Sequence, residues 1–290
     1  RVVEEALKSL LARLHLEQQD TLRFIGTSPK DKQKRVYGGQ VLAQAMNAAT
    51  RTVDPARRVH SLHAYFLRPG NPAEPIVYEV DPLRDGRGFS TRAVVARQGG
   101  RAIFNASLSF QLPESGLEHQ DPMPDVPPPE SLESDFDFYS ALAERHPERY
   151  HKPNRWAMDY RMIDRADPLE HAPMPARCRL WMRAGGPVPD VPGIHQTLLA
   201  YMSDNYLIAT GLMPHGMGYD NPRLQNASLD HALWFYGDFR ADEWLYYDIA
   251  SPRAGGGRDF NVGRIFTREG RLVATAAQEG LIRLIADGGS

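Results

Sequence analysis

The sequence has little of what marks several large classes of protein. Cys178 is its only cysteine, so it can form neither an intramolecular disulfide nor a zinc site built from cysteines. No apolar run approaches the roughly 18 residues that a membrane-spanning helix needs, and no secretory signal follows the first residues. The formal net charge is only -2, so no overall basic field attracts nucleic acid. We therefore expect a cytoplasmic protein that neither inserts into membranes nor binds nucleic acid.

The common catalytic and nucleotide-binding motifs are also missing. No Gly-x-Ser-x-Gly elbow supplies the serine of an α/β-hydrolase, and neither a Walker loop nor a His-Glu-x-x-His zinc motif occurs. Cys178 lies in a predicted strand, where a buried packing role is favoured over a catalytic thiol. We therefore predict no metal site and no cofactor, and the chemistry must come from other polar side chains.

The first part of the chain predicts a helix buried against an antiparallel sheet. Residues 3–16 have the spacing of an amphipathic helix, and residues 41–49 are apolar on nearly every side, which is typical of a buried helix. Between 60 and 111, runs rich in Val, Phe, Tyr and Ser alternate with tight turns such as Asp85-Gly86. Such runs indicate antiparallel strands. One buried helix against a curved antiparallel sheet is an α+β arrangement.

The second part repeats this plan after a linker rich in proline. Six prolines lie between residues 113 and 131, a density that no helix or sheet interior tolerates. Three landmarks then recur in the same order, about 156–170 residues apart: Gly38–Gln40 as Gly193–Gln196 before a helix over Thr197–Tyr206, His63–Leu67 as His231–Phe235, and Gly100–Ala106 as Gly270–Ala276. A tandem repeat of one fold explains this order. We predict an N-terminal domain over 1–115, a linker and connecting helix over 116–155, and a C-terminal domain over 156–290.

Three polar side chains of the second part are candidates for chemistry. Asp204 ends an otherwise apolar helix, where it faces the negative end of the helix dipole and loses hydration, and both effects make a carboxylate a better base. Gln278 aligns with Leu108 of the first part, so an apolar position has become an amide that needs hydrogen-bond partners. Ser228 begins a predicted strand. The residues alone leave open that Asp204 caps a turn or faces solvent, and that Ser228 is purely structural.

Many separate blocks of the sequence, in a fixed order, match one known family: Val36–Gln40, His60–Gly70, Ser107–Gln111, Trp181–Ala184, Ser203-Asp204, Leu229–Phe235 and Gln278–Gly280. In these blocks the chain resembles the acyl-CoA thioesterase II (TesB-like) family over essentially its whole length. The resemblance implies a tandem (double) hotdog, with two antiparallel sheets each wrapped around a central helix, and we expect the two units to pair into one continuous sheet. The family's water-activating Asp, Thr or Ser, and Gln fall on Asp204, Ser228 and Gln278. Serine in place of the commoner threonine loses the methyl group that restricts its rotamer.

The resemblance implies hydrolysis of a fatty acyl-CoA substrate to free fatty acid and CoA. Backbone N–H groups of Gly38 and Gly39 are candidates to bind the oxyanion, although a tight turn into a packed helix explains these glycines equally well. Met46 and Met202 are either lining for the acyl chain or plain core. Candidates to meet the CoA phosphates are Arg68, Arg84, Arg87, Arg253 and Arg258, although a solvated loop charge is the favoured interpretation of each one alone. We also expect a homo-oligomer.

Two other functions stay open. A hotdog hydratase needs an Asp–His pair on one helix, and Asn205–Ile208, which follow Asp204, include no histidine. The repeat gives His63 and His231 equivalent strand positions, which favours a structural hydrogen bond for both. A non-enzymatic acyl-CoA-binding module would need another partner for Gln278. A hydrolysis assay that detects the free thiol distinguishes the enzyme from the binding module.

Overall fold

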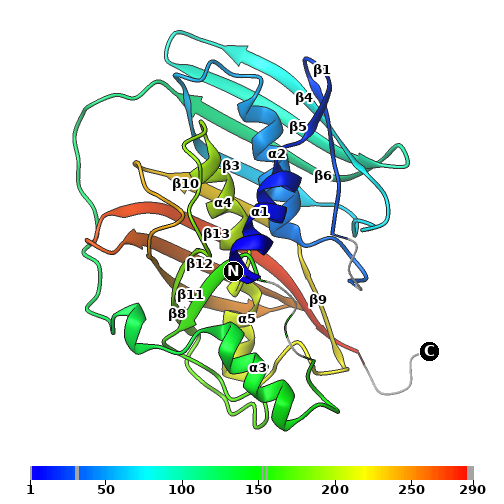
Figure 1. Ribbon diagram of the computed structural model, residues 1–290, viewed down its shortest axis with the longest axis vertical. Helices are drawn as coiled ribbons and strands as arrows, with labels where there is room; N and C mark the ends of the chain where they lie inside the picture. The colour runs from blue at the N-terminus through cyan, green and yellow to red at the C-terminus, as the bar shows by residue number, and fades with distance from the viewer. Residues whose placement is uncertain (1, 30–32, 152, 154–155, 286–290) are drawn as a thin grey trace.

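The computed structural model describes residues 2–29, 33–151, 153 and 156–285. Thirteen strands form one antiparallel sheet, and the central helices lie against it (Figure 1). The N-terminal half contributes α1 (Val2–Leu14), β1 (Glu17–Asp20), β2 (Arg23–Gly26), α2 (Gly38–Thr50), β3 (Arg58–Phe66), β4 (Ile76–Asp85), β5 (Phe89–Gln98) and β6 (Arg101–Gln111). The C-terminal half contributes β7 (Met158–Met162), β8 (Arg177–Ala184), α4 (Ile194–Ser203), α5 (Leu207–Leu212), the 3-10 helix η2 (Met213–His215), β9 (Leu224–Ser228), β10 (Asp230–Phe235), β11 (Leu245–Gly255), β12 (Arg258–Thr267) and β13 (Leu272–Leu284).

The strand order reveals the repeat. From the middle outward, β3-β6-β5-β4-β2 runs to one side and β10-β13-β12-β11-β8 runs to the other, while β9 pairs with β13. The two series meet where β3 pairs with β10, and in this seam Leu62 lies opposite Leu233. Both leucines are fully buried. The predicted α+β double hotdog is confirmed, and its two sheets are continuous through the seam.

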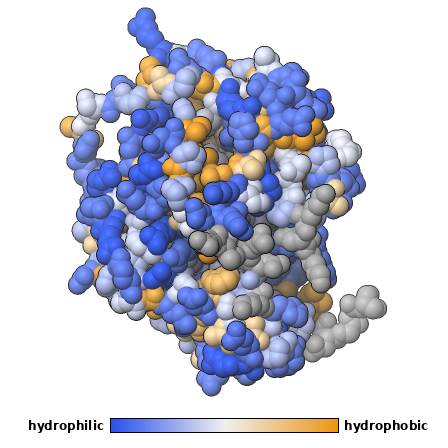
Figure 2. All heavy atoms as spheres, viewed as in Figure 1, coloured by the Kyte–Doolittle hydropathy of each residue, from blue (hydrophilic) through white to orange (hydrophobic). Residues whose placement is uncertain are grey.

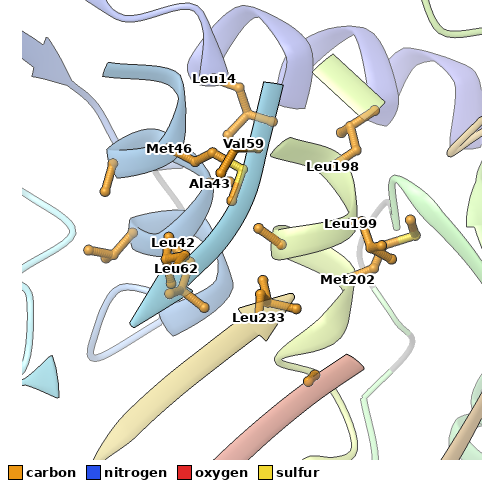
Figure 3. Close-up of a cluster of buried hydrophobic side chains, with 14 of the residues drawn as sticks. Leu14, Leu42, Ala43, Met46, Val59, Leu62, Leu198, Leu199, Met202 and Leu233 are labelled. Atoms are coloured by element: carbon orange, nitrogen blue, oxygen red, sulfur yellow. The ribbon is translucent and has the colours of Figure 1, made fainter. Parts of the chain in front are cut away.

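The helices of the two halves pack against each other in opposite directions. A Cβ added to Gly38, at the start of α2, would lie 2.8 Å from Asp204 after the end of α4. At the other end of the pair, a Cβ added to Gly193 would lie 2.9 Å from Thr50. Figure 3 shows apolar side chains of both helices in the core, including Leu42 of α2 and Leu199 of α4. Residues 41–49 are apolar on nearly every side because α2 is covered both by the sheet and by α4.

The surface is largely polar on one face, and the described helices are short. The face shown in Figure 2 is mainly hydrophilic, with apolar residues gathered in its upper half. Within the described residues no helix is long and apolar enough to cross a membrane.

The predicted second helix over Thr197–Tyr206 is wrong in its bounds. Helix α4 starts at Ile194 and ends at Ser203, and the chain then turns before α5. Tyr206 adopts a left-handed backbone with φ 72°, which a helix cannot continue through. Its hydroxyl bonds to Asp135, far away in the sequence, so local helix propensity gives no sign of the break.

Asp135 belongs to the connection between the halves. This segment runs from the end of β6 through the 3-10 helix η1 (Pro129–Ser131) to α3 (Asp135–Arg145). Ser134 caps α3 by accepting the N–H of Asp137 at 3.1 Å. The Asp135 side chain is 1% exposed and forms an ion pair with Arg165 at 2.7 Å. The connection is therefore anchored to the C-terminal half beside the break that follows α4.

Candidate active site

Asp204 lies where α4 ends. The last carbonyls of a helix lack partners within it, and here two tyrosine hydroxyls donate to them: Tyr37 to the Tyr201 carbonyl at 2.8 Å and Tyr247 to the Ser203 carbonyl at 2.9 Å. Burial raises the pKa of Tyr37 and of Tyr247 well above the usual value, and Asp204 raises both further, so both phenols are neutral donors. They fix the backbone that carries Asp204.

The N-terminus of α2 faces the Asp204 carboxylate. The missing Cβ of Gly38 leaves the space next to Asp204 Oδ2, and a Cβ on Gly39 would collide with the Tyr201 carbonyl. Both glycines therefore permit the close approach of α2 to α4. In the described part of the chain no hydrogen bond uses the N–H of Gly38 or Gly39, as the first turn of a helix requires. The positive end of the α2 dipole stabilises the charge of Asp204. It offsets the negative end of α4, the one dipole that could be foreseen from the sequence.

Gln278 bonds directly to Asp204. Its amide nitrogen donates to Asp204 Oδ1 at 2.7 Å and lies 3.0 Å from His231 Nδ1. An amide nitrogen carries two hydrogens, so both bonds form together. They turn Gln278 Oε1 away from Asp204, and that buried oxygen has no hydrogen-bond partner among the described residues. Gln278 and its counterpart Leu108 are both buried, so an apolar core position has become polar, as the repeat predicts.

His231 continues the buried network on the far side of Gln278. Its Nε2 lies 3.0 Å from the hydroxyl of Ser203, which donates to the Ala200 carbonyl at 3.0 Å. Because Gln278 donates to Nδ1, the hydrogen of the neutral ring is on Nε2 and points to Ser203. A continuous set of donors and acceptors therefore joins the end of α4 to β10 and β13.

One expectation about histidine is wrong. His63 is not equivalent to His231: His63 is exposed with its ring against Trp234, whereas His231 is 1% exposed. An error of one residue in aligning two strands moves a side chain to the opposite face of the sheet. A histidine is also near Asp204, because β10 brings His231 Nδ1 to 3.6 Å from Asp204 Oδ1. Both ring nitrogens bond inside the protein, so His231 supports Gln278 and does not face a substrate.

Ser228 borders this network without joining it. It ends β9 opposite Gly280 of β13, two residues along the strand from Gln278. It does not begin the next strand, as the sequence suggests, because β10 starts at Asp230. Its hydroxyl makes no hydrogen bond to Asp204 or Gln278 within the residues described. The structure therefore brings Asp204, Gln278 and Gly38 together and leaves Ser228 half-buried at their edge.

Both halves of the chain match known protein families. Residues 153–281 match the family model described as acyl-CoA thioesterase, and residues 27–111 match the acyl-CoA thioesterase N-terminal domain. Acyl-CoA thioesterase 2 of Haemophilus influenzae is 38% identical over 97% of this chain and 99% of its own length. The chain belongs to the acyl-CoA thioesterase II family.

Two further proteins agree with this assignment. Acyl-coenzyme A thioesterase 8 of Mus musculus is 40% identical over 87% of this chain and 81% of its own length. The crystal structure of the acyl-CoA thioesterase II TesB2 from Mycobacterium marinum superposes with a TM-score of 0.78 at 40% identity, covering 97% of this chain and all of that one. As a member of this family, the chain is an acyl-CoA thioesterase, a thioester hydrolase.

The two methionine candidates of the thioesterase lie in its core. Met46 on α2 and Met202 on α4 are fully buried (Figure 3). A cavity of about 420 Å³ opens beside Arg183 and Arg240, and one of about 260 Å³ opens beside Trp156; neither is lined by Asp204 or Gln278. An acyl chain would reach Met46 or Met202 only after the packed helices move apart.

The candidate site includes residues that the sequence analysis did not place in it. His231, Ser203 and Tyr37 all contribute to holding Asp204 or Gln278. His231 had the same sequence signal as Gln278, because it alternates along its strand with the buried Leu233 and Phe235. Tyr37 and Ser203 bond to the end of α4 and have no such signal.

Proposed function

We propose that this thioesterase hydrolyses fatty acyl-CoA to a free fatty acid and CoA by means of a water that Asp204 activates together with Ser228 and Gln278. The observation that carries this proposal is the 2.7 Å hydrogen bond from Gln278 to Asp204 Oδ1, made beside the N-terminus of α2. This bond leaves Asp204 Oδ2 to accept a proton from water. The side chain of Asp204 is 5% exposed, so little bulk water competes with the substrate.

The reaction then needs no covalent acyl-enzyme. Asp204 takes a proton from the water while the water oxygen attacks the thioester carbonyl carbon. The carbon–sulfur bond of the resulting tetrahedral intermediate breaks, and the proton held by Asp204 passes to the departing CoA sulfur. Gln278 keeps the carboxylate oriented, and Ser228 at the edge of the site holds the water.

The oxyanion of the intermediate needs hydrogen-bond donors. Gly38 and Gly39 offer N–H groups at the positive end of α2 that have no partner among the described residues, and this position suits developing negative charge. Their position next to Asp204 supports this role, because water and polarised carbonyl must come within about 3–3.5 Å of each other. The catalytic site would then use residues of both halves.

Hydration of a double bond is less well supported. An Asp–His pair exists, but both nitrogens of His231 are engaged inside the protein. A purely binding role would leave the alignment of Asp204 by Gln278 without a purpose. The domain boundaries at 115 and 156, the homo-oligomer and the cytoplasmic location remain proposals on the basis of the sequence.

Replacement of Asp204 tests the mechanism. Asp204→Asn keeps the shape of the side chain but removes the base, so turnover should fall roughly 10²–10⁴-fold. Release of CoA thiol from a panel of short to long acyl-CoAs measures turnover and also reveals the preferred chain length. Normal turnover in Asp204→Asn would remove this residue from the mechanism.

Cys178→Ala is the matched control for a thiol step. Cys178 is 2% exposed, and burial raises the pKa of its thiol far above the usual value, so it stays protonated. The variant should keep nearly all of the activity. A large loss of turnover in a folded Cys178→Ala protein would contradict a mechanism that uses water alone.

A further inference from the structure

A second set of buried polar side chains continues from Gln278 along the sheet. Asn261 of β12 lies opposite Gln278, and Asp259, the next inward residue of β12, lies opposite Gly280. Asn261 is fully buried and Asp259 is 1% exposed. Among the described residues, both oxygens of Asp259, both amide atoms of Asn261 and Gln278 Oε1 lack hydrogen-bond partners of ordinary geometry. Buried polar atoms without partners are costly, so a contiguous row of them needs an explanation.

Two glycines make room for the Asp259 carboxyl. A Cβ added to Gly280 would lie 2.5 Å from Asp259 Oδ1, and one added to Gly211 of α5 would collide with Oδ2. Ile208, also on α5, covers Gly280. The sheet and α5 are therefore shaped around this carboxyl group.

The corresponding positions of the N-terminal half are fully paired. There Arg92 lies opposite Leu108, and Ser90 lies opposite Phe110. Arg92 and Ser90 both bond to Asp85, at 2.9 and 2.6 Å. In the C-terminal half Phe110 is replaced by Gly280 and Leu108 by Gln278, so the polar row there connects to the candidate active site instead of closing on itself.

The environment favours the neutral form of Asp259. Burial raises its pKa to about 6, against the smaller lowering effects of Asn261 and the Gly280 backbone, and Glu279 on β13 raises it slightly. Tyr219 is the other titratable group that responds to Asp259: burial raises the pKa of Tyr219, and the charges of Asp204 and Asp259 raise it further. Although much of the Tyr219 ring is exposed, its hydroxyl lies against the backbone of α5. Helix α5 carries no titratable side chain, and the β11 residue paired with Asp259 is Ala254.

We propose that Asp259 and Asn261 are positioning residues that fix the amide of Gln278 through a chain of hydrogen bonds. This inference rests on the proposed function of Gln278. In the proposed chain, which rotation of the Asp259 and Asn261 side chains would complete, neutral Asp259 donates its O–H to Asn261 Oδ1 and Asn261 Nδ2 donates to Gln278 Oε1. Gln278 Nε2 already donates to Asp204. Every donor in this chain meets an acceptor.

Ionised Asp259 reverses the chain. A carboxylate only accepts, so it turns the Asn261 amide nitrogen toward itself and the Asn261 oxygen toward Gln278 Oε1. Two acceptors then face each other, and the alignment of Gln278 with Asp204 is lost. Turnover should therefore fall as Asp259 ionises, although the residue never touches the substrate.

The pH profile of kcat tests this chain. In the native enzyme kcat should fall as pH rises through the ionisation of Asp259. Asp259→Asn keeps a donor toward Asn261 at every pH, so its kcat should stay near the native maximum and lack that alkaline decrease. Asn261→Leu breaks the chain without touching Asp259 and should lower kcat about tenfold or more at all pH values with KM little changed, because small displacements of a reacting group are costly.

Ser90→Ala is the matched control, since Ser90 holds the position of Asp259 in the other half and bonds only within that half. It should leave kcat and its pH profile unchanged. A native-like pH profile in Asp259→Asn together with native kcat in Asn261→Leu would overturn the proposal. Because Asp204→Asn is assayed in parallel, loss of activity in that variant alone would separate failure of this inference from failure of the proposed mechanism.

Discussion

Gln278 is a polar residue at a position that is apolar in the other half of the chain. Its counterpart Leu108 fills the core of the other half, and both side chains point inward from equivalent strands. An amide at this point is stable only because Asp204 and His231 accept from it. The same bonds orient the carboxylate, so stability and alignment of the site depend on the same contacts.

Gln278→Leu should separate the effect of Gln278 on stability from its effect on turnover. Leucine fits the space but leaves buried acceptors on Asp204 and His231 without a donor, which should cost about 1–3 kcal/mol of the free energy of unfolding. Turnover should fall on the order of 10²-fold, as for the loss of one oriented polar group in an active site. Urea unfolding and thiol-release kinetics measure the two quantities.

Gln44→Leu is the control. Gln44 is a fully buried glutamine on α2 that bonds to Tyr78 at 2.7 Å and to two backbone carbonyls. The variant should lose comparable stability and keep its kcat. Equal losses of kcat in both variants would mean that Gln278 acts on activity only through stability.

Asp259 makes the stability of the native protein depend on pH. Its pKa is raised in the folded state to about 6, so folding favours the protonated form. The stabilising contribution of protonated Asp259 to the free energy of unfolding is fully present below the ordinary pKa of an aspartic acid. It is lost as pH rises through about 6. Relative to the native protein, Asp259→Asn should therefore gain stability between pH 4 and pH 7.5, by up to roughly 3 kcal/mol. If the difference in unfolding free energy between the two proteins is constant across this range, the pKa of Asp259 is not raised in the folded state.

Among the secondary-structure elements, the break between α4 and α5 is what places Asp204 at a helix end. Sequence periodicity predicted a helix here and an apolar α2, but not the break, since Tyr206 is fixed by Asp135 from the connecting segment. A left-handed conformation costs a residue other than glycine about 1–3 kcal/mol, which the surrounding contacts must offset. Such contacts join distant parts of the chain and leave no periodic signal.

Tyr206→Phe should weaken this element. The variant keeps the ring but removes the hydroxyl that bonds to Asp135, which leaves Arg165 as its ionic partner among the described residues. The free energy of unfolding should therefore fall by about 1–3 kcal/mol. A modest decrease in kcat should accompany it as Asp204 becomes less firmly held. Thermal unfolding and steady-state kinetics are the measurements.

Tyr236→Phe serves as the comparison, because the exposed Tyr236 hydroxyl bonds to Thr275 away from the site. It should change neither quantity appreciably. If the two variants behave alike, the connecting segment does not hold the end of α4.

At the scale of the whole molecule, the repeat made the fold predictable and the site only partly so. Three landmarks in the same order were enough to predict two similar units and their joining at a sheet seam. The alignment of Gln278 with Leu108 held, since both are inward residues of long strands. The alignment of His231 with His63 was wrong by one residue, because a short strand contains too few residues to fix the register of an alignment. Residues that meet across both halves, such as Gly38 and Asp204, become neighbours only through the packing of α2 on α4.

The seam should hold the two halves together without the connecting chain. Gly116 lies in an exposed stretch where an added Cβ meets nothing within 4 Å, so a protease site inserted after it should be tolerated and cut. The cut protein should keep its mass in gel filtration and most of its kcat, because β3–β10 pairing and α2–α4 packing remain. Separation into two fragments without urea would show that the connection, not the seam, joins the halves.

The two ends of the α2–α4 pair carry opposite charges. Arg51 caps α2 and binds the Leu16 carbonyl at 2.6 Å, whereas Asp204 stands at the same point of α4. An arginine there suits the negative end of its own helix and serves only structure. The chain therefore has one carboxylate at the end of a central helix for its two hotdog units. In the mechanism that we propose, the N-terminal unit supplies no second base, and its contribution is the N-terminus of α2 that faces Asp204.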